Sequence, residues 1–463
     1  MSPAIRALSR LAVIITALML MACSSDAPKP NIVLIVMDTT RQDHLSCYGY
    51  DRANTPNLEE LARESTLFRS AYSVGSWTPP GHASLFTGLY PAAHGCTQEN
   101  WTLSGDLVTL AEILGGAGYR TVGITENATV SAASGFDQGF DEYHETWRHD
   151  IPQDNPAVAL FNSSMATIDP EFPFFLFVNF IEPHAPYKSS GEFIDTYVKD
   201  PGSGPDGNDT QDYYLGRLNW NEPEFAHMQA LYDAEILYTD QQIGRIIDRL
   251  KQDNLWDNTV FIVTSDHGEN IGDHGHMEHY FTLYESVVRI PLLIHYPQAF
   301  PPGAEDNDPT QLTDLVPTLL NLLELGEGDT QGIDLLETGA RKDRPVLLEF
   351  YWPAEAIETY GEDWDSVELN RWKRHLRAVI YGDDKLIWAS DGDHELYDLQ
   401  ADPAEENNLT HLPGGADKVE ALTSLLENLI KRYHRDIPGD RISGGPELDE
   451  ETREALRSLG YVR

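Results

Sequence analysis

Several residues able to bind a metal ion follow apolar, strand-like segments of this 463-residue chain. Asp38 ends the run NIVLIVMD, and Asp266 and His267 follow TVFIVTS. Carboxylate oxygens combined with one imidazole suit a divalent cation such as Ca²⁺, Mg²⁺ or Mn²⁺. Taken one at a time, each residue has a structural explanation, because a strand-ending Asp often caps a helix and DHG often forms a turn.

A hydroxyl residue stands at the start of a predicted helix in the segment SWTPPGHASLFTG, residues 76–88. We predict Thr78 as the N-cap, with Pro79 and Pro80 at the first helical positions, where a missing N–H costs little. The amides and dipole of a helix N-terminus favour a bound oxyanion. A hydroxyl beside a divalent cation can lose its proton and attack phosphorus or sulfur. Thr78 could also be no more than a cap, but the metal-binding residues favour the nucleophile.

Buried strands must position these side chains. Continuous apolar runs predict strands covered on both faces, at residues 31–38, 174–187, 259–269 and 290–296. Helical periodicity lies between them, at residues 55–65, 107–118, 224–252 and 311–325. The alternation predicts an α/β fold with a doubly wound, mostly parallel sheet flanked by helices. Such sheets bind ligands at the carboxyl ends of their strands, where Asp38, Asp266 and His267 fall together with His184.

The character of the sequence changes near residue 345. Residues 377–399 predict successive antiparallel strands, the first pair joined by a Gly-Asp-Asp turn, and 419–434 predicts a helix. We therefore expect a catalytic domain at 31–345 and a smaller C-terminal α+β subdomain at 346–463. Residues 188–222 are rich in Gly, Asp, Asn and Pro, which predicts a long surface insertion, either a lid or a variable loop.

The first residues carry a targeting pattern. Arg6 and Arg10 precede a short apolar run that ends at Cys23, and a polar tether follows at 24–30. The stretch 1–23 resembles a bacterial lipoprotein signal peptide, in which Cys23 becomes the lipidated N-terminus. The alternative is an uncleaved anchor, although the run is short for a membrane span. We expect a lipid-anchored protein of the bacterial cell envelope, facing the periplasm or the cell surface.

The chain is strongly acidic, with a formal net charge of −43. Such a surface repels nucleic acid and anionic membrane, so it argues against nucleic-acid binding and favours solubility in exposed surroundings. An anionic substrate then needs local help from a metal or a helix N-terminus. After processing, Cys47 and Cys96 remain, either as a disulfide or as two free thiols.

Several segments in this order resemble the sulfatase branch of the alkaline phosphatase superfamily over nearly the whole mature length. NIVLIVMDTTRQDHLSCYGY is similar to the family's first metal strand, TPPGHASLFTGLYPAAHG to its nucleophile helix, and FVNFIEPHAPY to the segment with an active-site histidine. The resemblance extends through TVFIVTSDHGENIGDHG to HELYDLQADPAEENNL. It implies an ester hydrolase with a metal at Asp38, Asp266 and His267, and with His184 in the active site.

The departures from the family are as informative. Thr78 stands where the family's C/S-x-P-x-R motif has the residue converted to formylglycine, and its β-methyl prevents that aldehyde. His82 replaces the arginine of that motif, and Thr39 replaces the second Asp of an Asp-Asp pair. The segment GITEN stands where a G-K-x-H segment is typical, and His279 where a lysine is expected. The formylglycine apparatus is therefore changed at several positions together.

The remaining residues predict a different, threonine-dependent site, similar to that of phosphodiesterases and phosphoalcohol transferases of the same superfamily. Thr78 joins Asp38, Asp266 and His267 around one divalent ion and attacks the phosphorus. His184 or His279 protonates the leaving alcohol, a role that suits imidazole near neutral pH. His82 either replaces the charge of the arginine or packs beside the helix. We do not identify ligands for a second metal, although His274, His276 and His279 form a histidine cluster.

Three functions remain open. The first is a metal-dependent hydrolase or transferase that cleaves phosphoester or phosphonate ester bonds through Thr78. The second is a sulfuric ester hydrolase working without formylglycine, and the third is a non-catalytic binding lipoprotein, which has no need of the metal-binding residues. We expect the substrate to be a small-molecule, glycan or lipid-headgroup ester, with membrane contact only through the anchor at Cys23.

Overall fold

The computed structural model describes residues 29–149, 151, 155–169, 171–188, 191–198, 204–352, 372–435 and 448–459. The signal peptide expected at 1–23 and all of the expected tether except Lys29 and Pro30 lie outside the described residues, so both remain predictions. Among the helices of the described part, none is long and apolar enough to cross a membrane.

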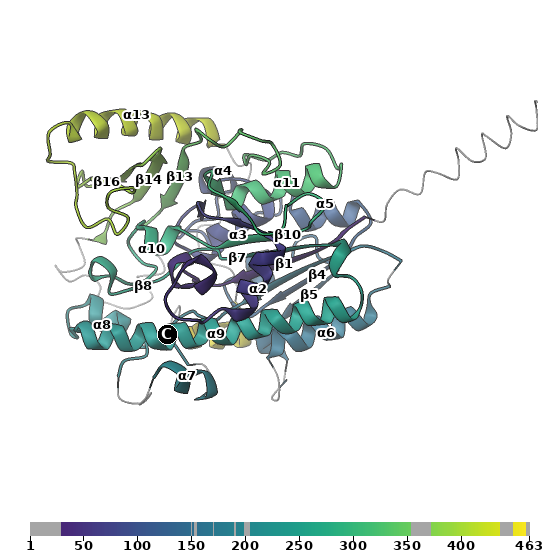
Figure 1. Ribbon diagram of the computed structural model, residues 1–463. Helices are drawn as coiled ribbons and strands as arrows, with labels where there is room; N and C mark the ends of the chain where they lie inside the picture. Colours follow the sequence, from purple (N-terminus) through teal and green to yellow (C-terminus); the bar gives the residue numbers. More distant parts are fainter. Residues whose placement is uncertain are drawn as a thin grey trace, which may run out of the picture. The chain divides into compact units, whose positions relative to one another are not determined.

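An eight-stranded sheet forms the centre of the fold (Figure 1). Its strands are β1 (Asn31–Met37), β2 (Thr66–Phe68), β4 (Arg120–Thr125), β5 (Glu142–Glu145), β6 (Phe174–Phe180), β7 (Thr259–Thr264), β10 (Leu292–His295) and β11 (Ala304–Asp306). They lie in the order β11-β2-β10-β7-β1-β6-β4-β5. The five strands from β7 to β5 are parallel, whereas β10 is antiparallel to both of its neighbours. The mostly parallel sheet confirms the predicted α/β fold.

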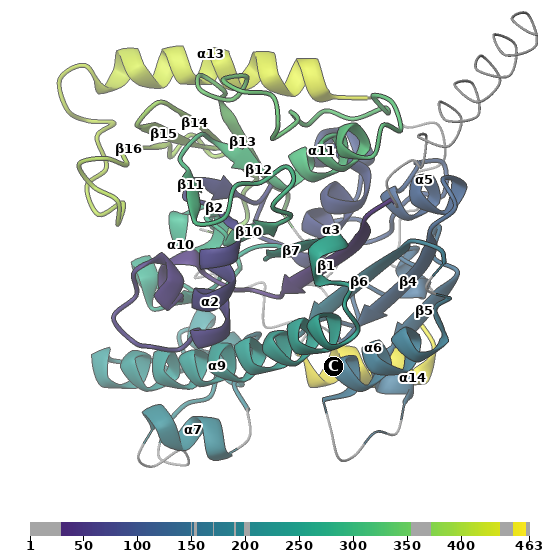
Figure 2. The ribbon, with the colours of Figure 1, turned by 45° about the vertical axis from the view of Figure 1, so that its right-hand side comes forward.

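Helices cover both faces of the sheet (Figures 1 and 2). One face packs against α2 (Pro56–Glu64), α6 (Pro156–Thr167) and α9 (Glu222–Gln252), and the other against α3 (Thr78–Thr87), α5 (Leu110–Gly116) and α11 (Leu315–Leu322). Alternate residues of β1 therefore enter different cores: Val33 and Ile35 face the α9 side, and Ile32 and Leu34 face the α3 side. This two-sided burial explains why the strand sequences are continuously apolar.

A four-stranded antiparallel sheet follows in the C-terminal part. It contains β13 (Val346–Phe350), β14 (Leu376–Tyr381), β15 (Asp384–Ala389) and β16 (Glu395–Asp398), in that order. The helix α13 (Gly415–Tyr433) covers one face through Leu422, Leu426 and Leu429. The expected α+β character of this region is confirmed. The chain from Asn31 to Arg463 forms one compact unit, and the domain boundary at 345 stays a prediction.

The segment 188–222 is more than the surface loop that its composition predicted. It carries the short helices α7 (Gly191–Tyr197) and α8 (Thr210–Tyr214), while residues 189–190 and 199–203 lie outside the described part. Tyr214 is buried and donates a hydrogen bond to the Met277 carbonyl at 2.7 Å. The aromatic residues of this segment therefore pack onto the protein, which a count of Gly and Asp residues does not reveal.

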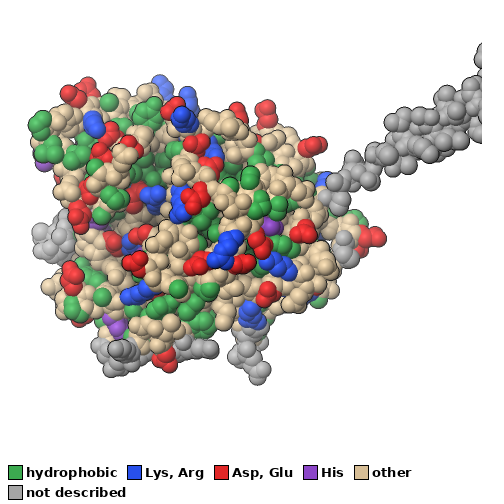
Figure 3. All heavy atoms as spheres, in the orientation of Figure 1, with side chains coloured by type: hydrophobic (Ala, Val, Ile, Leu, Met, Phe, Trp, Pro, Cys, Tyr) green, Lys and Arg blue, Asp and Glu red, His purple; other side chains and the backbone are tan. Residues whose placement is uncertain are grey.

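The remaining short elements include α4 (Pro91–His94), α10 (Glu285–Val288), α14 (Glu450–Ser458), and the strand pairs β3 (Ala71–Tyr72) with β12 (Thr310–Gln311) and β8 (Asn270–Ile271) with β9 (Met277–Glu278). Cys47 and Cys96 are free thiols that pack into the cores on opposite faces of the sheet. On the face drawn in Figure 3, Lys and Arg side chains lie among Asp and Glu side chains and form no separate basic patch.

Candidate active site

Adjacent strand ends bring three metal-binding side chains together. Asp38 follows β1, and Asp266 and His267 follow β7, which runs parallel to β1 with Val36 opposite Thr264. One ligand atom from each of the three residues lies within 4.8 Å of the others, and all three side chains are buried. Within the described ranges, no other group of His, Cys, Asp or Glu side chains meets this condition.

The carboxylates of this group fit a cation. Asp38 Oδ1 and Asp266 Oδ2 are buried and accept no hydrogen bond. Burial raises the pKa of Asp38 well above its usual value, and the neighbouring Asp266 raises it further. Burial also raises the pKa of Asp266 to about 7. Two adjacent buried carboxylates are costly unless a positive charge compensates them, and two carboxylates with one imidazole suit a divalent ion.

Thr78 points its hydroxyl at this group. Its Oγ1 lies 3.1 Å from His267 Nε2, and the hydroxyl partly offsets the raised pKa of the Asp266 carboxyl group. The helix α3 approaches Asp266 closely because residue 81 is glycine: a Cβ there would lie 3.1 Å from the Asp266 Cβ. The predicted nucleophile and the predicted metal-binding residues thus form one buried cluster.

The predicted capping role of Thr78 is wrong in detail. Trp77 is the N-cap, with extended φ and ψ of −151° and 140°, and Thr78 is the first helical residue. With Trp77 as the N-cap, Pro79 and Pro80 are the second and third helical residues. Neither has an N–H, so a side chain at the N-cap would find no donor there. For the same reason, Thr78 alone among the first three residues of α3 can offer an amide to an oxyanion, fewer than we expected.

His82 packs beside the helix. Its Nδ1 lies 3.0 Å from the Thr78 carbonyl, and its ring makes edge contacts with Phe86, Phe136 and Phe177. Burial lowers the pKa of His82 to about 3, so the imidazole is neutral near pH 7. The same Nδ1 lies 3.6 Å from Asp266 Oδ2, so both roles considered for His82, packing and replacement of an arginine charge, stay predictions.

Of the two histidines predicted to protonate a leaving group, His279 lies next to His267 and His184 lies next to His279. The ring centroid of His279 is 4.5 Å from that of His267 and 5.3 Å from that of His184. Burial lowers the pKa of His184 to about 4 and that of His279 well below its usual value. His274 lies apart: its Nε2 bonds the Ala404 carbonyl and its ring stacks on Tyr284.

Two asparagines that the sequence did not indicate hold Asp38 in place. Asn127 Nδ2 donates to Asp38 Oδ2 at 2.7 Å, and Asn179 Nδ2 does so at 3.4 Å. Asn179 Oδ1 in turn accepts the backbone N–H of Asn127. Asn127 is the last residue of GITEN, where the family resemblance led us to look for Lys or His. The one feature of the sequence that could have indicated Asn127 is its position just beyond the end of β4.

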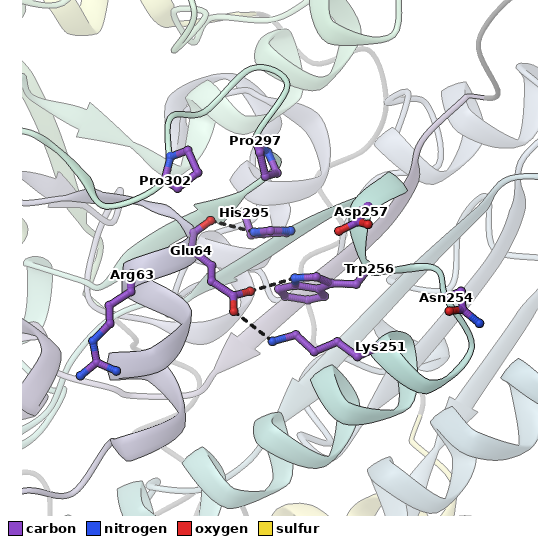
Figure 4. Close-up of a pocket in the computed structure, with 9 residues that line it drawn as sticks. All are labelled: Arg63, Glu64, Lys251, Asn254, Trp256, Asp257, His295, Pro297 and Pro302. Carbon is purple, nitrogen blue, oxygen red and sulfur yellow. Dashed lines mark hydrogen bonds and ion pairs between the residues drawn. The ribbon is translucent and has the colours of Figure 1, made fainter.

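A cavity of about 500 Å³ lies away from this site (Figure 4). Trp256 and Asp257 line it and precede β7, whereas Asp266 and His267 follow that strand. Glu64 organises its wall, because its carboxylate accepts from Trp256 Nε1 and Lys251 Nζ, and its carbonyl accepts from His295 Nδ1. The cavity therefore belongs to the opposite end of the sheet.

Comparison with known families agrees with this geometry. The model of the family described as "Sulfatase" matches residues 30–325, which is more than half of the chain. The chain belongs to the sulfatase family. It is an ester hydrolase of that family. The model described as "N-sulphoglucosamine sulphohydrolase, C-terminal" matches residues 272–432 and so includes the antiparallel sheet.

Individual relatives align over most of their length. The N-acetylglucosamine-6-O-sulfatase of Bacteroides thetaiotaomicron is 26% identical, over 92% of this chain and 91% of that protein. The arylsulfatase of Clostridium perfringens is 26% identical, over 86% of this chain and 94% of that protein. The crystal structure of the phosphonate monoester hydrolase of Agrobacterium radiobacter has a TM-score of 0.71 and 21% identity, over 88% of this chain and 96% of that chain, which shows a shared fold.

Proposed function

We propose that this protein cleaves phosphoester or phosphonate ester bonds with Thr78 as its nucleophile. The phosphoryl or phosphonyl group then passes to water or to an acceptor alcohol. The observation that carries the proposal is the buried Thr78 hydroxyl, 3.1 Å from His267 Nε2 and beside a carboxylate oxygen of Asp266 that has no partner. A lipid anchor at Cys23 would place the activity at the cell envelope. The shared fold of a phosphonate monoester hydrolase is compatible with the same chemistry.

Asp38, Asp266, His267 and Thr78 would hold one divalent cation, Ca²⁺, Mg²⁺ or Mn²⁺. Such an ion, when bound, lowers the pKa of an adjacent hydroxyl and offsets charge on the ester oxygens. The unpartnered oxygens Asp38 Oδ1 and Asp266 Oδ2 support this assignment. The neighbouring Asn127 keeps the second Asp38 oxygen occupied, so that Oδ1 is the one left for the ion.

The chain's own residues supply the remaining steps. Thr78 Oγ1, whose proton has passed to solvent, forms a bond to phosphorus while the bond to the leaving oxygen breaks, and the imidazolium form of His279 or His184 gives that oxygen a proton. Water or an acceptor alcohol then attacks the phosphorus and releases Thr78. The same imidazole, now neutral, accepts the proton of the attacking molecule.

Sulfate ester hydrolysis is the second candidate, and the names of the relatives favour it. The bacterial proteins at 26% identity are an N-acetylglucosamine-6-O-sulfatase and an arylsulfatase. Thr78 cannot become formylglycine because its Cβ carries a methyl group. A sulfatase reaction here would therefore use the threonine hydroxyl itself or a water molecule.

Matched p-nitrophenyl esters separate these candidates. The full chain would be assayed with a sulfate, a phosphate monoester, a phosphodiester and a phosphonate monoester, each with Mn²⁺, Mg²⁺ or Ca²⁺. We expect turnover of a phosphorus ester that Thr78→Ala abolishes and Thr78→Ser partly retains. Thr87→Ala is the matched control, since its hydroxyl bonds the Ala83 carbonyl in the same helix. Sulfate turnover that survives Thr78→Ala would refute the proposal.

A further inference from the structure

Glu269 is a buried carboxyl group that the steps above do not use. Its side chain is fully buried, and neither Oε1 nor Oε2 has a hydrogen-bond partner. A carboxyl group without a partner in a protein interior is costly, so such groups point to a function. Arg41 forms no ion pair with this carboxyl group, although its charge acts to lower the pKa of Glu269: the guanidinium bonds the Glu269 backbone carbonyl and pairs with Asp43 and Asp273.

The Glu269 carboxyl group faces His279. Its Oε1 lies 3.5 Å from His279 Nδ1, and both side chains are fully buried. The neighbouring carboxyl group of Glu278 bonds Thr210 and Tyr280 instead. A carboxylate beside one nitrogen of an imidazole decides which nitrogen carries the proton and how the ring is oriented.

The backbone holds this pair in register. Strands β8 and β9 are antiparallel, with Asn270 opposite Glu278. Glu269, just before β8, and His279, just after β9, are therefore the next two residues to face each other. Glu278 and Phe281 on either side of the His279-Tyr280 dipeptide have φ of 54° and 64°. Non-glycine residues adopt this conformation at a cost, and such positions cluster at functional sites.

We propose that Glu269 is the positioning residue for His279. Its carboxylate accepts the Nδ1–H of the neutral His279 ring, which leaves Nε2 free to take up a second proton from solvent. The same carboxylate stabilises the resulting imidazolium, which presents Nε2–H to the leaving oxygen of the ester. As the bond from phosphorus to that oxygen breaks, the Nε2 proton moves to the oxygen, and Nδ1–H stays bonded to Glu269. The assignment of His279 as the proton donor rests on the proposed function, whereas the 3.5 Å contact between Glu269 and His279 does not.

Leaving-group dependence tests the role. Two phosphonate monoesters with the same acid part would be compared, one releasing p-nitrophenol and one releasing methanol. General acid catalysis contributes about 10²–10⁴-fold, and it matters most for the poor leaving group. We expect Glu269→Gln to lower kcat for the methyl ester about 100-fold, to change kcat for the p-nitrophenyl ester less than about 3-fold, and to leave KM unchanged. Equal losses on both esters would overturn the proposal.

Two controls separate positioning from general damage. Glu278→Gln removes the neighbouring carboxyl group, and we expect it to leave the ratio of the two rates unchanged. In a His279→Ala background, Glu269→Gln should cause no further loss on the methyl ester. A changed ratio in the Glu278 variant, an additive loss in the double variant, or a lower Mn²⁺ content of Glu269→Gln would each contradict the role.

Nitrogen-15 NMR of the histidine rings tests the pair without any turnover, so it separates failure of this inference from failure of the proposed function. The His279 signal would be assigned by its disappearance in His279→Gln. We expect the wild-type ring to carry its proton on Nδ1 and to lose that preference in Glu269→Gln. A wild-type His279 protonated on Nε2 alone would overturn the inference, even if no ester were turned over.

Discussion

Asn127→Ala should weaken metal binding while leaving every predicted metal ligand in place. The amide of Asn127 donates to Asp38 Oδ2 at 2.7 Å inside a fully buried site. A hydrogen bond to a charged group contributes about 1.5–3 kcal/mol. At about 1.4 kcal/mol for each factor of ten, its loss raises the Kd for the ion roughly 10- to 100-fold. Outer hydrogen-bond partners of metal ligands have effects of about this size.

The assay is calorimetric titration of Mn²⁺ into the metal-stripped full chain and its variants. Asn57→Ala is the matched control, because Asn57 Nδ2 also donates at 2.7 Å to a buried carboxylate, that of Asp240, away from the site. We expect Asn57→Ala to leave the Kd for Mn²⁺ unchanged. An unchanged Kd in Asn127→Ala would refute the reasoning that this amide prepares Asp38 for the ion.

Two further predictions concern stability. Lys385 Nζ lies 2.9 Å from Glu285 Oε1 and 2.8 Å from Glu405 Oε1 and is fully buried, so Lys385→Met should lower the free energy of unfolding by about 3–5 kcal/mol. The exposed pair Lys418–Asp384 supplies the control, and a urea midpoint as high in Lys385→Met as in Lys418→Met would contradict this prediction. Burial and the adjacent Glu182 together raise the pKa of Glu126 from 4.5 to about 8, so the protonated form favours folding. The free energy of unfolding should therefore fall as pH rises from about 4.5 through about 8, and it should fall less steeply in Glu126→Gln. The same pH dependence in Glu126→Gln and in the wild-type protein would contradict this prediction.

The central sheet and its metal-binding edge could be predicted from the sequence. Asp38 and Asp266 end continuous apolar runs, and parallel strands carry such residues to the same edge. His267 needed no separate argument because it follows Asp266 directly. Thr78 was predicted as an N-cap but is the first helical residue, because the two prolines that follow it fit either register.

The supporting residues could not be predicted, for a different reason. Asn127 reaches Asp38 from just beyond β4 and Asn179 from within β6, and single polar residues at such positions carry no pattern of their own. Glu269 faces His279 through strands β8 and β9 of two residues each, which are too short to show periodicity. The buried aromatic residues within 188–222 were likewise hidden by the Gly and Asp residues around them. The domain boundary at 345 and the lipid anchor at Cys23 stay predictions.

The most direct test of the account is to look for the covalent intermediate on Thr78. The protein would be acid-quenched during turnover of the best phosphorus ester, digested and examined by mass spectrometry. We predict a phosphoryl or phosphonyl group on the peptide that contains Thr78, absent from the same peptide of Thr78→Ala. Turnover with Thr78 unmodified at every quench time, together with activity retained in Thr78→Ala, would contradict the claim that this threonine is the nucleophile.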